Sequence, residues 1–200
     1  MKEFTVPMAL VDYIPVVLFS LATVILIKNL VRKEKPIAEA MIVIGGFLIA
    51  AAGFLKATYK LLYALNVGDF VWMSDQMMVN QALGMLISGI GLTLFTVKGS
   101  GRAKAYLVIP TMAKIGCMIV GLCAMDASLS FMAAKLNRKK AMPLFIISFF
   151  CSLCMGYLSS RDFTKASMNW IAQGVNTMGQ LLYYLGCRAL DKGGLKNLKF

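Results

Sequence analysis

The sequence predicts an all-α integral membrane protein, a bundle of six to seven transmembrane helices. Of its 200 residues, 59% are hydrophobic and only 15% are charged, and Lys and Arg gather between long apolar runs. A soluble domain averages about 45–50% apolar and about 25% charged residues, and disordered chains are poor in hydrophobic residues. Because backbone groups in lipid must pair internally and no segment alternates like a barrel strand, the spans are expected to be helices.

The first two spans are separated by a cluster of basic residues. Thr5 to Ile27 is interrupted only by Asp12, and its apolar run is longer than the roughly 7–15 residues of a cleavable signal, so it reads as a retained span. Ile37 to about Leu65 is the second, and Pro36 suits its first turn. Its last ten residues carry the mixture of basic and aromatic groups typical of a membrane interface, namely Lys56, Tyr59, Lys60 and Tyr63.

The remaining spans follow turns or basic blocks. Asn66 to Asp69 reads as a turn. A helix then runs from Val71 or Gln76 to Val97. Beyond the stretch 102–136, further spans cover Ala141 to about Ser160 and about Ser167 to Leu190. No Pro/Ser-rich linker divides the chain, which indicates a single transmembrane domain over residues 1–200.

The number of crossings depends on residues 102–136. As one helix they would be about 52 Å long, which is long for one crossing and short for two. One crossing gives six spans and places nine of the loop Lys and Arg residues on one side of the membrane and eleven on the other. Two crossings give seven spans and place fifteen of these Lys and Arg residues on one side and five on the other. Because cytoplasmic loops are enriched in these residues, we expect seven spans, the N-terminus outside and the C-terminus in the cytoplasm, with breaks at Gly116, Gly121 or Asp126. The alternative is one long tilted helix.

Two segments of the chain are similar to each other. Asp69-Phe70 and Asp162-Phe163 are both followed by Ser at +5 and by amides at +7 and +11. If this reflects a duplication, repeat halves 5–97 and 118–190 would run parallel in a 3+1+3 plan. That layout resembles the SWEET and PQ-loop sugar transporters, whose parallel repeats frame a site at the membrane midplane. The resemblance is one of layout only, since the chain contains no Pro-Gln dipeptide.

The spacing of Asn and Gln side chains is the clearest polar pattern in the predicted spans. On the last span they are spaced 4, 3 and 4 residues apart, which places them on one helix face that must point inward. A shorter amide stripe lies on the helix 71–97, and a Trp lies near the outer end of each helix. The functional interpretation is a pocket for a neutral polar solute between these two helices, and the structural one is helix–helix pairing. The candidate binding residues are Gln76, Asn80, Asn169, Gln173, Asn176, Gln180, Trp72 and Trp170.

Three charged residues inside spans are candidate coupling groups, because a charge there is costly unless it is paired or hydrated. They are Lys114, Asp126 and Asp12. Lys114 and Asp126 would be about 18 Å apart along a straight helix, so they meet only if the chain turns back. With seven spans, Asp126 is expected near the outer surface.

Enzyme chemistry has little support in the sequence. There is no His, which removes His-ligated haem and Ser–His proteases, and no phosphate-binding glycine motif is present. Cys151 and Cys154 form a C-x-x-C pair, for which packing as small apolar side chains is preferred and redox work is the alternative. We therefore expect no catalytic residue, no metal and no cofactor.

The expected function is a small transporter, or the substrate-binding membrane subunit of one, for a neutral polar solute. The alternative is a non-transporting sensor or partner subunit that uses the same polar stripes for assembly. The expected location is the cell membrane, plasma or inner. The expected partners are the bilayer, anionic lipid on the basic face, the solute, and a second copy or another membrane protein. Nucleic acid is not expected.

Overall fold

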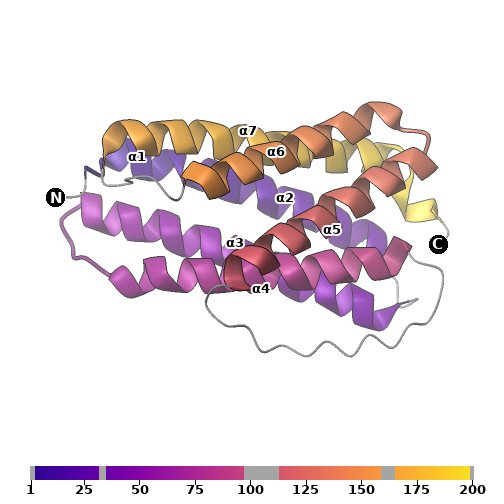
Figure 1. Cartoon of the computed structure of the whole chain (residues 1–200), viewed down its shortest axis with the longest axis horizontal. Coiled ribbons are helices and arrows are strands. Elements are labelled where there is room, and N and C mark those ends of the chain that lie inside the picture. Colours follow the sequence, from indigo (N-terminus) through magenta and orange to yellow (C-terminus); the bar gives the residue numbers. More distant parts are fainter. Residues whose placement is uncertain (1–2, 32–34, 97–112, 159–164, 199–200) are drawn as a thin grey trace.

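The computed structural model describes residues 3–31, 35–96, 113–158 and 165–198. All regular structure in these ranges is helical, and the long helices lie side by side in one bundle (Figure 1). The all-α prediction is therefore confirmed, and each predicted span outside 102–136 matches a helix to within about three residues at either end. Helices are expected here because their backbone groups pair within the segment.

The first candidate span consists of two helices, α1 (Val6–Val11) and α2 (Tyr13–Leu30), with Asp12 between them. The hydroxyl of Thr5 caps α1 by accepting a hydrogen bond from the Met8 N–H at 3.4 Å. Pro15 has no N–H to donate four residues back, to Val11, so the helical ladder is weakened at this point. The interruption places the Asp12 side chain inside the bundle, where it is buried.

The rest of the described chain forms five long helices and two single-turn 3-10 helices. Asn66 and Asn137 both have φ of 55°, and Asn tolerates this left-handed conformation in turns better than most residues. The turn predicted at Asn66 is thus present. The helices are α3 (Pro36–Ala64), α4 (Val71–Thr96), α5 (Ala113–Lys135), η1 (Lys139–Ala141), α6 (Met142–Leu158), α7 (Ala166–Lys192) and η2 (Leu195–Asn197).

Five of the described helical segments are long and apolar enough to cross a membrane: α1 with α2, then α3, α4, α5 and α6. They support an integral membrane protein. α7 is as long as the others but does not belong to this group, because a row of amides and other polar residues lowers its hydropathy.

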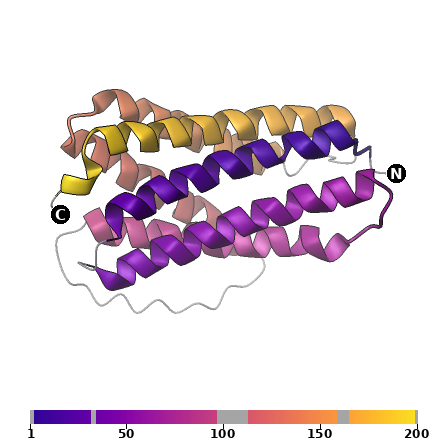
Figure 2. The ribbon, with the colours of Figure 1, turned by 180° about the vertical axis from the view of Figure 1, so that it is seen from behind.

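Close contacts fix the direction of each helix. Gly121 of α5 packs against Met85 of α4, and further along the hydroxyls of Thr93 and Ser128 lie 3.4 Å apart, so α4 and α5 run in the same direction. Gly46 lies against Thr23 and Gly53 against Val16, so α3 is antiparallel to α2. Gly45 lies against Ser88 and Ala38 against Gly91, so α3 is also antiparallel to α4. Helix α6 is likewise antiparallel to α7, and the two chain ends lie at opposite ends of the bundle (Figure 2).

The predicted break within residues 102–136 is wrong where the structure describes that stretch. Helix α5 continues without interruption past Gly116, Gly121 and Asp126. Gly121 instead permits close packing, because a Cβ there would lie 2.5 Å from the Leu86 nitrogen of α4. Residues 97–112, on which a second crossing depends, lie outside the described ranges.

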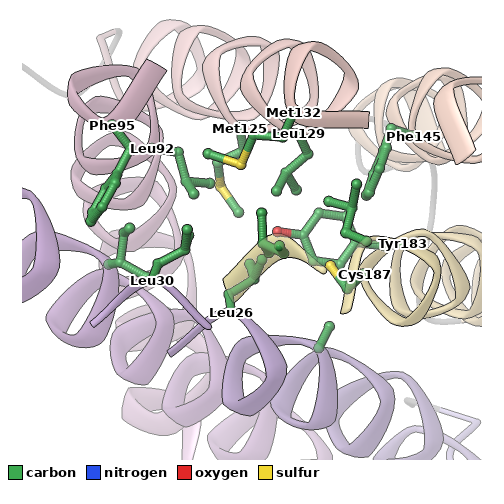
Figure 3. Packing of buried hydrophobic residues seen from close by; sticks show 14 of the residues in the cluster. Leu26, Leu30, Leu92, Phe95, Met125, Leu129, Met132, Phe145, Tyr183 and Cys187 are labelled. Carbon is green, nitrogen blue, oxygen red and sulfur yellow. The ribbon is translucent and has the colours of Figure 1, made fainter. Parts of the chain in front are cut away.

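Buried apolar side chains from the six helices α2 to α7 form the core (Figure 3). Leucines of α2 and α4 meet methionines of α5, while Phe145 of α6 packs edge-to-face on Tyr183 of α7 at 5.9 Å between ring centroids. This core lies toward the end of the bundle where α2 and α7 terminate. It closes that end and leaves the opposite half more open.

The same closed end is strongly basic. Nine of the described Lys and Arg residues lie there, and three (Lys56, Lys60 and Lys165) lie toward the other end. Eight of the nine are exposed and Lys35 is half-buried. The nine are Lys28, Lys35, Lys135, Arg138, Lys139, Lys140, Arg188, Lys192 and Lys196.

Candidate functional site

A cavity of about 350 Å³ lies in the more open half of the bundle, bounded by α2 to α7. Its wall is mostly apolar and rich in methionine, an unbranched side chain that adapts to ligands of different shape. Six side chains with polar groups interrupt this wall: Lys56 of α3, Gln81 of α4, Ser152 and Tyr157 of α6, and Asn176 and Gln180 of α7. The methionines are Met77, Met78, Met85, Met118 and Met155.

Two members of the α7 amide stripe face this cavity. Asn176 and Gln180 are four residues apart, so they project from one face of the helix. The Gln180 Oε1 atom is buried and accepts no hydrogen bond from the described part of the protein. Such an acceptor is costly unless a water molecule or a ligand satisfies it.

The other two members of the stripe hold helices together. Asn169 is fully buried, and its Oδ1 accepts a hydrogen bond of 2.9 Å from the Lys60 ammonium. Gln173 donates a hydrogen bond of 2.9 Å from Nε2 to the carbonyl of Met8 in α1. The stripe is therefore divided, with one half linking α7 to α3 and α1 and the other half lining the cavity.

Asp12, Lys60 and Asn169 form a buried group that we call the outer polar cluster. The Lys60 ammonium lies 2.6 Å from the Asp12 carboxylate, and their side chains are 6% and 10% exposed. The ring of Phe4 lies 5.5 Å from the same ammonium and adds a cation–π contact. Lys56, one turn earlier on α3, interacts electrostatically with both Lys60 and Asp12, so the cluster borders the cavity.

The predicted residues of α4 do not line the cavity. Gln76 is exposed and Asn80 is half-buried, whereas the neighbouring Gln81 faces the cavity. Trp72 and Trp170 are 58% and 45% exposed and belong to the outer surface. Helices α4 and α7 both contribute residues to the cavity wall, but α4 does so through Gln81 and not through Gln76 or Asn80.

Asp126 is the predicted residue whose position differs most from expectation. It was expected near the outer surface, yet it is 5% exposed within α5, and both carboxylate oxygens lack a hydrogen-bond partner in the described structure. The reason is that α5 passes straight through this region instead of turning there. The side chain of Lys114 lies outside the described part of the chain.

Sequence reasoning missed Lys56, Lys60 and Gln81 as site residues. The two lysines were assigned to the membrane interface because aromatic residues surround them, but both turn toward the inside of the bundle. Their spacing of four residues was a usable signal, since it places both on one helix face. For Gln81 the sequence offered no signal, because only packing determines which side of α4 faces inward.

The arrangement of the cysteines and acidic residues can be followed in the described part of the chain. Within the described ranges, no three His, Cys, Asp or Glu side chains gather closely enough to hold a metal ion. All five cysteines are free thiols: Cys187 is buried, Cys117 and Cys151 are half-buried, and Cys123 and Cys154 are exposed.

Comparison of the chain with protein-family models, curated protein sequences and solved structures gives no match. An assignment of function must therefore come from the cavity and the polar groups around it.

Proposed function

We propose that this chain is a small membrane transporter, or the substrate-binding membrane subunit of one, for a small neutral solute that carries polar groups. The cavity is the observation that supports this proposal. Its volume of about 350 Å³ is within the range of about 300–1,000 Å³ typical of ligand sites. Five of the six helices that bound it are candidate membrane spans, and a transported solute must bind between such spans.

The lining indicates the chemistry of the solute. The amides of Gln81, Asn176 and Gln180 donate and accept hydrogen bonds without carrying charge, which suits hydroxyl, amide or carbonyl groups. The methionine-rich remainder suits an apolar body. The one charged side chain in the wall, Lys56, interacts electrostatically with Asp12 of the protein itself. A compact neutral solute with one hydrogen-bonding side and one apolar side therefore fits better than a fully hydrated ion.

We further propose a seven-span topology with the N-terminus outside and the C-terminus in the cytoplasm, in which the basic closed end of the bundle faces the cytoplasm. An odd number of crossings places the two chain ends on opposite sides, as they lie in Figure 1. The helices α2, α3, α4 and then α5, α6, α7 each run in the order forward, back, forward, which is the arrangement that parallel repeats would have. The cavity lies between these two triplets, where transporters built from parallel repeats bind substrate.

Ligand binding by the protein in lipid nanodiscs tests this proposal. A panel of small neutral sugars, polyols, amides and amino alcohols is screened for thermal stabilisation. For any binder, Asn176→Leu and Gln180→Leu should each weaken affinity by about 5- to 150-fold, because a lost hydrogen bond that strands a buried polar group costs about 1–3 kcal/mol. Gln76→Leu is the matched control, since Gln76 is exposed on α4 and should leave affinity unchanged.

Two results would contradict the proposal. One is a binder whose affinity is unchanged in both α7 variants. The other is a panel without any binder, combined with a stable oligomer or co-purifying membrane partner that Gln180→Leu disrupts. The second result would favour a partner subunit that uses the polar stripe for assembly.

A further inference from the structure

The described chain contains one deeply buried carboxyl group that has no cation beside it and accepts no hydrogen bond. Asp126 is 5% exposed, and neither of its oxygens is hydrogen-bonded. Its neighbours on α5, Met125 and Leu129, belong to the apolar core. Asp12, by contrast, is paired with Lys60.

A second buried polar group faces the same region. The hydroxyl of Tyr183 is buried and unpartnered within the described structure, and Figure 3 shows it directed from α7 into the core. Electrostatic interactions link Asp126 to Tyr183 and to Cys187, one turn further along α7. The carboxyl, phenol and thiol thus form one internal group.

Helix α7 carries buried oxygens without a described hydrogen-bond partner both at the cavity and in the core. Gln180 lines the cavity, and Tyr183 follows three residues later, so both lie on one face of α7. The Gln180 Oε1 and Tyr183 Oη atoms are both buried without a described hydrogen-bond partner. Gln180 in the cavity wall and Tyr183 in the core thus carry two unsatisfied oxygens on the same face of α7.

No charge on the surrounding helices compensates a carboxylate at this position. Helix α5 packs on α4, α6 and α7. The only charged residue of α4 is Asp75, which is exposed, and α6 has none. Those of α7 (Arg188, Asp191 and Lys192) are exposed near its C-terminus, as are Lys139 and Lys140 of η1.

A carboxylate without a counter-charge in an apolar interior is unstable, so it takes up a proton or binds a cation. A metal cation needs several oxygen ligands at once, and no group of three acidic, Cys or His side chains gathers in the described structure. A proton needs only the carboxyl itself. Protonation joins H⁺ from water to one carboxylate oxygen, and release returns H⁺ to water.

We propose that Asp126 is an internal proton-binding site that couples solute transport to proton movement. The coupling rests on the transporter function proposed above, whereas proton binding does not. Protonated Asp126 is neutral and compatible with the closed core. Deprotonation becomes favourable only when the core opens and water reaches the carboxylate through the cavity.

Infrared difference spectroscopy tests proton binding without any solute. Wild-type protein in nanodiscs should show the carbonyl band of a protonated carboxylic acid, which disappears as the pH is raised. Asp126→Asn should lack this band, and Asp75→Asn, which changes an exposed carboxylate on α4, should keep it. Tyr183→Phe retains the carboxyl and should shift the pH midpoint of the band, so the test also works if Asp126→Asn does not fold.

Transport in liposomes tests the coupling. With a binder from the panel, a pH gradient should drive accumulation by wild-type protein, and Asp126→Asn should reduce accumulation at least tenfold while exchange of solute continues. Absence of an Asp126 band at every pH would overturn proton binding. A band combined with unchanged accumulation in Asp126→Asn would overturn coupling. A titrating band without any solute binder would support the proton site and contradict the proposed transport function instead.

Discussion

The outer polar cluster should be one of the most sensitive points of the fold, and Lys60→Met is the perturbation that tests it. Methionine has a length similar to that of lysine but no charge. The ammonium lies 2.6 Å from Asp12 and donates to Asn169 at 2.9 Å. The substitution therefore leaves a carboxylate that is buried and has lost its cation.

The magnitude follows from this geometry. At 2.6 Å and an effective dielectric constant of about 20, the attraction between the two charges is about 6 kcal/mol. The cost of removing both charges from water offsets much of it. Removing one partner of a buried pair costs about 3–5 kcal/mol, and we expect Lys60→Met to lose that much free energy of unfolding. Neutralising both partners should cost less than the sum of the single changes by about 2–3 kcal/mol.

The assay is unfolding in mixed micelles with increasing SDS, followed by tryptophan fluorescence. The variants are Lys60→Met, Asp12→Asn and the two combined. Lys165→Met is the control: it removes an exposed Lys near the same end of the bundle and should stay within about 0.5 kcal/mol of wild type. A Lys60→Met protein as stable as this control, or strictly additive losses in the double variant, would refute the reasoning.

Three further predictions concern packing, hydrogen bonding and topology. Gly121→Ala should lower the free energy of unfolding by about 1–3 kcal/mol, because a Cβ there meets the backbone of α4, whereas Gly116→Ala, which has open space, should not destabilise the fold. Unfolding of these two glycine variants in SDS checks this prediction, and equal free energies of unfolding would contradict it. Gln173→Leu should cost about 1–2 kcal/mol by removing the bond to α1 and leave ligand affinity unchanged. In a cysteine-free background, a Cys replacing Asn66 should react with impermeant reagents from outside and one replacing Asn137 only from the cytoplasm. The reverse pattern would contradict the orientation.

The amount of structure that the sequence could predict differs from element to element. Most spans were predictable because a run of apolar residues between basic clusters has few alternatives in lipid. The helices within the stretch 102–136 were harder to predict. Gly116 and Gly121 lie in similar apolar sequence, yet within the described structure nothing packs against Gly116, whereas Gly121 lies against the backbone of α4. Sequence alone does not distinguish a glycine that ends a helix from one that lets two helices meet.

The candidate site was predictable in part. Helical spacing placed the α7 amides on one face, but it did not show that Asn169 would meet Lys60 while Gln180 faced a cavity. That division depends on α1, which packs against the beginning of α7 and takes the Gln173 hydrogen bond. Long-range packing of this kind leaves no local pattern. The buried position of Asp126 depended in the same way on the path of α5.

Accessibility of the cavity from both sides of the membrane is the most direct test of the transporter assignment. In a cysteine-free background, Gln81→Cys places a single thiol in the cavity wall. We expect an impermeant thiol reagent to label it from outside and, in a separate experiment, from the cytoplasmic side, with bound solute slowing both reactions. Labelling from one side only, or labelling that no solute slows, would contradict the account.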